Sequence, residues 1–363
     1  MPEFGVYVHV PFCRHRCDYC AFATWTDRDH LMEAYVDAVV TDIGRAAAGG
    51  MPPADTVFFG GGTPTRLAPE LVVRMLSAIP RTDPASAEVT VECNPDDVTA
   101  EMMLAFAEGG VTRVSLGVQS MVSSVLASLG RTHSPDNVAT AVAHARAAGI
   151  DSVNLDLIYG GHGETIDDWR RTVDGAIALN PTHVSAYALT IEAGTPLAAD
   201  VSRHPDDDDL ADKYMVADDL LAAAGLANYE ISNWARPGHE CRHNVVYWSQ
   251  GDYRGFGCAA HSHERGRRWW NVRTPDRYID AVTRGDDAVG GEEILDVATR
   301  AREALELSLR TKDGVPSAAL DVDDLADLVE VRGERVVLTR RGRLLANEVS
   351  LRLKPDPPAS RSH

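Results

Sequence analysis

Apolar and polar positions alternate along residues 4–190 in two repeating patterns. Short runs rich in Val, Tyr, Phe and Thr fit the strands of a parallel sheet, and they cover residues 4–10, 56–61, 88–94, 113–119, 152–160 and 183–190. Between these runs, apolar residues recur at helical spacing over residues 31–48, 69–79, 135–148 and 166–179. Strands that alternate with helices form a parallel sheet covered by helices. Six such units predict an α/β fold with a TIM-like but partial (β/α)6 barrel.

Two changes of pattern divide the chain into three regions. The acidic connector RHPDDDD begins at residue 203, so we expect the barrel to occupy residues 1–203. The middle region, 204–293, begins with one expected helix over residues 210–224. The rest of it is rich in Gly, Trp, Tyr and His and poorly periodic, which predicts loops and short strands. Residues 294–363 predict a small helical, winged-helix-like domain, with helices over 297–309 and 320–328, a strand over 335–338 and a final helix through 352.

Charge narrows the range of partners. The 363 residues include 35 basic and 54 acidic side chains, which gives a formal net charge of −19. This charge repels phosphate backbones and anionic lipid surfaces, so we expect no nucleic-acid partner and no binding to a membrane surface. No apolar run reaches the ~18 residues that a membrane span needs. The first residues form no basic leader before the first strand, which predicts a cytoplasmic protein.

Three of the six cysteines lie close together after the first strand. Cys13, Cys17 and Cys20 form a C-x3-C-x2-C run, and three thiolates at this spacing suit three irons of a 4Fe-4S cluster. The fourth iron would then be open to a small chelating molecule. The alternatives are a zinc site completed by His9 or His15, or three unrelated thiols. The other cysteines are single and are expected to be small buried apolar residues: Cys93, Cys241 and Cys258.

Polar residues stand where the predicted strands end. They are the run Gly60-Gly61-Gly62-Thr63 after the second strand, Glu92 on the third, Gln119 on the fourth and Asp156 in the fifth. Because enzymes of barrel folds place their sites at this face, we expect one polar ligand site there. The run GGGTPT lacks the lysine of a phosphate-binding loop, and residues 1–200 contain no lysine. This excludes a P-loop NTPase and a Schiff-base aldolase in the barrel.

The run YVHVPFCRHRCDYC resembles the cluster loop of the radical S-adenosylmethionine (radical SAM) superfamily. In these proteins the amino and carboxylate groups of SAM chelate the open iron. The resemblance implies SAM contacts at Tyr7, Tyr19, Gly61, Gly62, Thr63, Glu92, Gln119, Arg131 and Asp156. It suggests Thr63 and Glu92 for the ammonium group, Arg131 for the carboxylate, and Gln119 with Asp156 for the ribose.

The resemblance extends over nearly the whole chain, to the oxygen-independent coproporphyrinogen III oxidase-like group. The runs that carry it include FFGGGTPT, VECNPDD, RVSLGVQS, LGRTHS, NLDLIYG and GFGCAAHS. Within this group the chain is most similar to the HemW family of haem chaperones. Phe22 stands where the oxidases carry a fourth cysteine, and residues 243–248 read HNVVYW, which matches the HNxxYW motif of the chaperones.

The implied function is binding of haem and its transfer to acceptor haem proteins. The alternative is oxidative decarboxylation of coproporphyrinogen III by a 5′-deoxyadenosyl radical, and a third candidate is a radical SAM methyltransferase or another small-molecule enzyme. For haem, His243 is the expected iron ligand, with Tyr247 and Trp248 against the porphyrin face. Other candidates are ligands at His239, Cys241, His261 or His263 and propionate-binding cations at Arg236 and Arg242. One departure from the family is His162, near Gly160, where a proline is usual.

Overall fold

Six parallel strands in chain order form the centre of the molecule. The structure is a computed structural model that describes residues 3–354. The parallel strands are β1 (Gly5–Val10), β2 (Thr56–Gly61), β3 (Glu88–Cys93), β4 (Arg113–Gln119), β5 (Ser152–Tyr159) and β6 (His183–Ala188). They confirm the six strand runs expected from the sequence.

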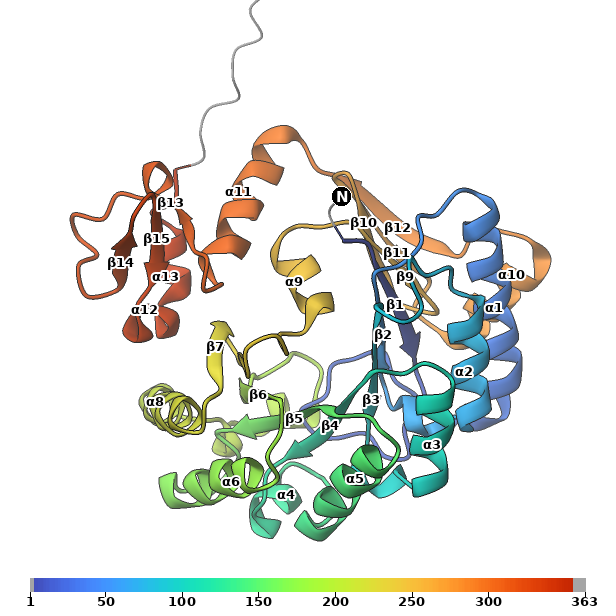
Figure 1. The fold of residues 1–363 in the computed structure, drawn as a ribbon, viewed down its shortest axis with the longest axis horizontal. Helices are drawn as coiled ribbons and strands as arrows, with labels where there is room; N and C mark the ends of the chain where they lie inside the picture. Colours follow the sequence, from blue (N-terminus) through green and yellow to red (C-terminus); the bar gives the residue numbers. More distant parts are fainter. Residues whose placement is uncertain (1–2, 355–363) are drawn as a thin grey trace, which may run out of the picture.

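Helices cover the outer side of this curved sheet (Figure 1). They are α1 (Met32–Ala48), α2 (Pro69–Ala78), α3 (Ala100–Glu108), α4 (Ser123–Ser128), α5 (Pro135–Ala147), α6 (Ile166–Ala178), α7 (Pro196–Ala199) and α8 (Asp207–Ala223). Short 3-10 turns lie at Asp29–Leu31, Pro64–Arg66, Pro95–Asp97, Val201–Arg203 and Ser317–Ala319. Ser134 and Thr165 form capping boxes that begin α5 and α6, so both helices begin at the expected residues.

The two faces of β1 differ in polarity, and this difference positions the site. Val6, Val8 and Val10 are fully buried in the core that also contains residues of α1. Because successive side chains of a strand point to opposite faces, Tyr7 and His9 face the other side of the sheet. Burying each valine contributes roughly 1.5–3 kcal/mol, which fixes the register of the strand and therefore the direction of Tyr7.

The middle region extends the sheet at both edges. Its elements are β7 (Ala227–Glu230), β8 (Asn233–Ala235), α9 (Arg242–Trp248), β9 (Tyr253–Phe256), β10 (His261–Glu264), β11 (Arg267–Asn271), α10 (Pro275–Arg284) and β12 (Val289–Ile294). Strand β8 pairs antiparallel with β6, and β9 pairs parallel with β1. The sheet therefore has twelve strands, in the order β12-β11-β10-β9-β1-β2-β3-β4-β5-β6-β8-β7. The short strands expected among loops in this region are therefore present, and each has three to six residues.

The C-terminal unit contains a small antiparallel sheet with its own apolar core. It begins with α11 (Val297–Leu309), continues through β13 (Val315–Pro316), β14 (Val329–Arg332) and β15 (Arg335–Leu338), and ends with α12 (Arg340–Leu344) and α13 (Ala346–Ser350). The strand order is β13-β15-β14. Strand 335–338 and helix 297–309 are confirmed. Residues 355–363 of the expected third region lie outside the described residues.

The helix expected over residues 320–328 is wrong. This segment runs as turns, and Leu320 and Leu325 reach the small core from an irregular backbone. Asp321 accepts a hydrogen bond from the backbone N–H of Asp323, a local contact that competes with helix formation. The final helix is also interrupted, since α12 and α13 are two short helices. None of the helices in residues 3–354 is both long and apolar enough to cross a bilayer.

Candidate functional site

The cysteine loop leaves β1 and returns to the end of that strand. Its base is closed by two backbone hydrogen bonds, from Cys13 N to Trp25 O at 3.0 Å and from Trp25 N to Pro11 O at 2.8 Å. The loop holds Cys13, Cys17 and Cys20 half-buried, and all six cysteines are free. The backbone therefore presents three reduced thiols on one short closed loop.

Two polar side chains from the segments after β2 and after α4 approach these thiols. The Thr63 hydroxyl donates to Cys13 Sγ at 3.5 Å, and Arg131 Nη1 donates to Cys17 Sγ at 3.7 Å. Burial raises the pKa of Cys13 and of Cys20, so a bound cation is needed to hold both as thiolates. The hydrogen-bond donors Thr63 and Arg131, together with the positive charge of Arg131, suit the anionic thiolate ligands of an iron-sulfur cluster.

The alternative zinc site lacks a free histidine nitrogen at His9. Its Nδ1 lies 3.2 Å from the Tyr7 hydroxyl, and its Nε2 lies 2.9 Å from the Ala23 carbonyl oxygen. Across residues 3–354, no group of three or more His, Cys, Asp and Glu side chains is arranged as ligands of one metal ion. His9 is therefore not available to complete a zinc site, whereas His15, the other histidine of that alternative, is exposed on the cysteine loop.

The glycine run after β2 is required by packing against β1. Gly61 has a φ of 106°, and a Cβ at this position would enter the ring of His9. At Gly62, a Cβ would come 2.6 Å from the Val10 carbonyl oxygen. Only glycine fits such a close crossing of two chain segments. The run therefore brings the Gly61 N–H and Thr63 toward the site.

A pair of carboxyl groups lines a cavity of about 200 Å³, which we call the inner cavity. Glu92 Oε2 accepts a hydrogen bond from Gly61 N at 3.1 Å, and burial with the nearby Asp156 charge raises the pKa of Glu92 to about 8. Burial also raises the pKa of Asp156, although Ser115 and Asn154 donate to its carboxylate at 2.7 and 2.9 Å. Two acids that resist ionisation in one cavity are suited to a cationic ligand, which would favour their charged forms.

The remaining predicted residues are Gln119 at the end of β4, Arg131 after α4 and Tyr19 on the cysteine loop. Gln119 is a non-glycine residue with a φ of 61°, next to an irregularity in the pairing of β4 with β5. Strain of this kind persists where the surrounding structure enforces it, often at ligand sites. Arg131 Nη2 donates to Asn94 Oδ1 at 2.7 Å and to the Gly117 carbonyl oxygen at 2.8 Å. Tyr19 packs against a small apolar cluster that includes Leu197.

The structure brings the predicted SAM residues into two neighbouring groups. Tyr7, Glu92 and Asp156 line the inner cavity, whereas Thr63 and Arg131 lie against the cysteine loop. The sequence did not single out several polar residues: Asn94 beside Arg131, and Arg113, His183 and Tyr187 in the inner cavity. A signal existed for Asn94, which stands two positions after Glu92 in the run VECNPDD.

His243 lies in α9 with both ring nitrogens already engaged. Its Nδ1 is 2.9 Å from Thr56 Oγ1, and its Nε2 is 2.8 Å from the Tyr247 hydroxyl. The ring stacks on Phe58 at 5.3 Å between centroids, and its side chain is 1% exposed. Burial lowers the pKa of His243 to about 3, so the ring is neutral. Iron could reach His243 only by displacing one of these two hydroxyls.

The other candidates from the HNxxYW region are also occupied. Arg242 pairs with Glu3 at 2.8 Å, and Arg236 donates to Asn180 Oδ1 at 2.7 Å. Cys241 is buried, with its thiol 3.6 Å from Glu88 Oε1. The turn containing His162 is closed independently of that residue, since Gly160 N donates to the Glu164 carboxylate at 2.7 Å.

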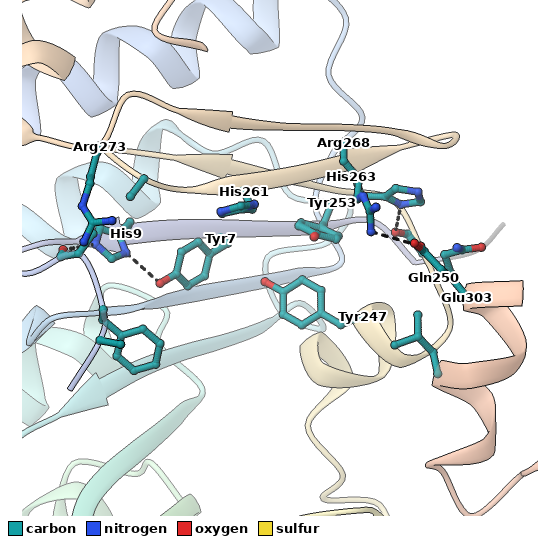
Figure 2. Close-up of a pocket in the computed structure, with 16 residues that line it drawn as sticks. Tyr7, His9, Tyr247, Gln250, Tyr253, His261, His263, Arg268, Arg273 and Glu303 are labelled. Atoms are coloured by element: carbon teal, nitrogen blue, oxygen red, sulfur yellow. Dashed lines mark hydrogen bonds and ion pairs between the residues drawn. The ribbon is translucent and has the colours of Figure 1, made fainter. Parts of the chain in front are cut away.

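A larger cavity of about 660 Å³ lies between the cysteine loop, the strands β9–β11 and α11 (Figure 2). We call it the outer cavity, and it is lined by Tyr7, His9, Ala21, Phe22, Ala23, Tyr247, Gln250, Gly251, Tyr253, Ala259, His261, His263, Arg268, Arg273, Glu303 and Leu307. Tyr7 and Tyr247 line both cavities and therefore form the wall between them. The volume of the outer cavity falls in the range of ~300–1,000 Å³ that small-molecule sites occupy.

Comparisons with known proteins agree with this arrangement. Residues 7–176 match the family model of the radical SAM superfamily. The chain is 43% identical to "Heme chaperone HemW" of Mycobacterium tuberculosis (strain ATCC 25618 / H37Rv), over 95% of this chain and 93% of that protein. It is 33% identical to "Heme chaperone HemW" of Bacillus subtilis (strain 168), over 95% of this chain and 97% of that protein.

The fold is also that of a solved structure. It matches coproporphyrinogen III oxidase (HemN) from Escherichia coli, described as a radical SAM enzyme, with a TM-score of 0.82 and 24% sequence identity over 97% of this chain and 90% of that one. The mixed α/β fold, with its large and mainly parallel sheet, is thus a radical SAM fold. The full-length identities show the finer relationship: this chain belongs to the HemW family of the radical SAM superfamily.

Proposed function

We propose that this protein is a haem chaperone, which binds haem in the outer cavity and passes it to acceptor haem proteins. The outer cavity itself is the observation that carries this proposal. It has about 660 Å³ of space, aromatic walls that suit a flat macrocycle, and an exposed arginine, Arg273, that suits a carboxylate. The full-length similarity to proteins named as haem chaperones supports the same function.

The partial barrel of β1–β6 would hold the resident cofactors. Cys13, Cys17 and Cys20 would bind a 4Fe-4S cluster, and the open iron would bind SAM, whose sulfonium carbon bond a reduced cluster can cleave. The inner cavity would place Glu92 near the ammonium group of SAM, since a cation there offsets the cost of ionising this buried acid.

We infer the other SAM contacts from the resemblance to the radical SAM superfamily. Thr63 lies at Cys13 and would also face the ammonium group, while Arg131 lies at Cys17 and would bind the carboxylate. Gln119 and Asp156 would hold the ribose hydroxyls, because a carboxylate and an amide accept hydrogen bonds from diols. Tyr7, Tyr19 and the backbone of Gly61 and Gly62 would complete the SAM site.

The C-terminal unit would act as a cap on the haem site. Glu303 and Leu307 of α11 line the outer cavity, so movement of this winged-helix-like unit would open or close it. We infer that the protein works in the cytoplasm, because a reducing compartment keeps six cysteines free. We expect no nucleic-acid partner, because the net charge of −19 repels phosphate backbones.

The experiment compares haem binding with oxidase activity in one anaerobic preparation of the full chain with a reconstituted cluster. Haem is titrated in and followed by the Soret band, and coproporphyrinogen III is supplied separately with SAM and a strong reductant. We expect saturable haem binding at one site per chain and no release of CO2 from the propionates. Turnover of coproporphyrinogen without haem binding would reject the chaperone function in favour of the oxidase alternative.

A further inference from the structure

We propose that His261 of β10, and not His243 of the HNxxYW motif, is the axial ligand of the haem iron, and that Arg273 binds a haem propionate. The proposal rests on the proposed function, because it names the groups that hold haem within the outer cavity. Both residues line that cavity.

His261 has the access that an iron ligand needs. Its side chain is exposed, and its ring stacks on Trp270 with 5.7 Å between centroids and 30° between planes. Within residues 3–354, no side chain or backbone group forms a hydrogen bond with its ring nitrogens. In Figure 2 the ring lies in the middle of the cavity, between Tyr7 and Tyr253. Stacking thus fixes the ring plane while both nitrogens stay available.

The charge state of His261 also suits iron. Burial and the nearby Arg268 charge lower the pKa of His261, so the ring is neutral at neutral pH. Only neutral imidazole has the lone pair that binds a metal.

The other histidines around the outer cavity are less suitable. His243 is buried, and both of its nitrogens contact hydroxyl groups. Both nitrogens of His9 are also engaged. His263 is 4% exposed, with Nδ1 at 2.9 Å from the Gly251 carbonyl oxygen and Nε2 buried without a partner. Iron could reach this Nε2 only after the surrounding side chains moved, whereas His261 is reached directly.

The cation for the propionate follows from the ion pairs at the cavity. Arg268 is already paired with Glu293 at 2.8 Å and Glu303 at 3.2 Å. Arg273 is exposed and makes no ion pair within the described part of the chain. In Figure 2 it lies at the opposite end of the cavity from Arg268, near His9. In a protein with a net charge of −19, an unpaired arginine at a cavity is available for an anionic group.

An apolar residue at the cavity provides a surface for the macrocycle. Phe22, from the cysteine loop, is 66% exposed although it is large and apolar. A porphyrin in the cavity would cover this ring, and burying an aromatic side chain is favourable by roughly 1.5–3 kcal/mol. Haem bound here would therefore lie directly beside the cysteine loop.

The test is a haem titration of the full chain with a reconstituted cluster, read by the Soret band and by the ferrous iron–histidine stretch in resonance Raman spectra. His261→Ala is expected to lose the iron–histidine signal and to bind haem at least about tenfold more weakly, since even loss of a group supporting a metal ligand costs 10–100-fold. Added imidazole should restore the signal. His30→Ala removes an exposed histidine outside the outer cavity and is the matched control.

Further variants separate the outcomes. His261→Gln keeps the side chain's size and should also lose the signal, and retained cluster absorbance shows that the variants are folded. Arg273→Ala should weaken haem binding while the Raman signal remains. An unchanged iron–histidine signal in His261→Ala, or its loss in His243→Gln with His261 intact, would overturn the assignment. If the unaltered chain binds no haem, the proposed function fails instead.

Discussion

Glu92 allows a quantitative test of the inner cavity. The carboxyl group has a pKa of about 8 in the folded protein, against 4.5 for the free side chain. Between these values the unfolded chain is ionised while the folded chain keeps its proton, so the free energy of unfolding falls as pH rises. At pH 7.5 this difference corresponds to roughly 4 kcal/mol, and at pH 5 to less than about 1 kcal/mol.

The substitution Glu92→Gln removes this penalty and keeps an oxygen that can accept from Gly61 N. Because Glu92 borders a cavity that water can enter, water offsets part of the cost. We therefore expect the variant to be more stable than the unaltered protein by at least about 1 kcal/mol at pH 8, and nearly equal at pH 5.

Urea unfolding of the protein without SAM, followed by circular dichroism at pH 5 and pH 8, measures this difference. Glu108→Gln removes one exposed carboxylate and controls for the change in net charge. A stability difference that is the same at both pH values would refute the reasoning, as would a variant that is less stable at pH 8. Either result would mean that Glu92 is ionised in the empty cavity.

Three further predictions concern stability. Gly61→Ala should lower the free energy of unfolding by at least about 2 kcal/mol, measured by urea unfolding, because φ is positive and the new methyl group enters the His9 ring. Lys213→Met should lower the free energy of unfolding by about 3–5 kcal/mol, because it leaves the buried Glu164 carboxylate without its cation. Calorimetry should show a lower melting temperature, and an unchanged temperature would contradict this. Burial lowers the pKa values of His9, His133 and His243 to about 4, 4 and 3. Each of these histidines should therefore lower the free energy of unfolding by about 2 kcal/mol when the pH falls from 7 to 5, and a free energy of unfolding that stays constant over this range would contradict it.

Local sequence signals predicted the six parallel strands and several of the helices that cover them. The strand and helix runs were visible because each is long enough to show its period, and Ser134 and Thr165 marked helix starts through capping. The sequence predicted short strands among the loops of residues 204–293 but could not give the bounds of β7 to β12, because strands of three to six residues show no clear period. The segment 320–328 shows the opposite case, in which apolar spacing suggested a helix but the small C-terminal core determined the backbone.

The candidate site was predictable where residue type and strand position agreed. Glu92 and Asp156 stand near the ends of parallel strands, and topology brings such ends together. The role of Gly61 in clearing the His9 ring could not be predicted, because it depends on a contact between two strands. Likewise, the sequence ranked His243 above His261 because of the HNxxYW motif, and it could not show that both ring nitrogens of His243 contact hydroxyl groups.

The central claim is that the protein carries haem and delivers it to haem proteins. The most direct measurement loads the full chain with haem, removes free haem, and mixes the complex with a haem-binding protein whose haem has been extracted. We predict that the absorption spectrum of the complex changes into that of the restored acceptor, and that the acceptor regains activity at a rate that increases with its concentration. An acceptor that gains haem no faster than from spontaneous dissociation, or a loaded chain that keeps its haem, would contradict the claim.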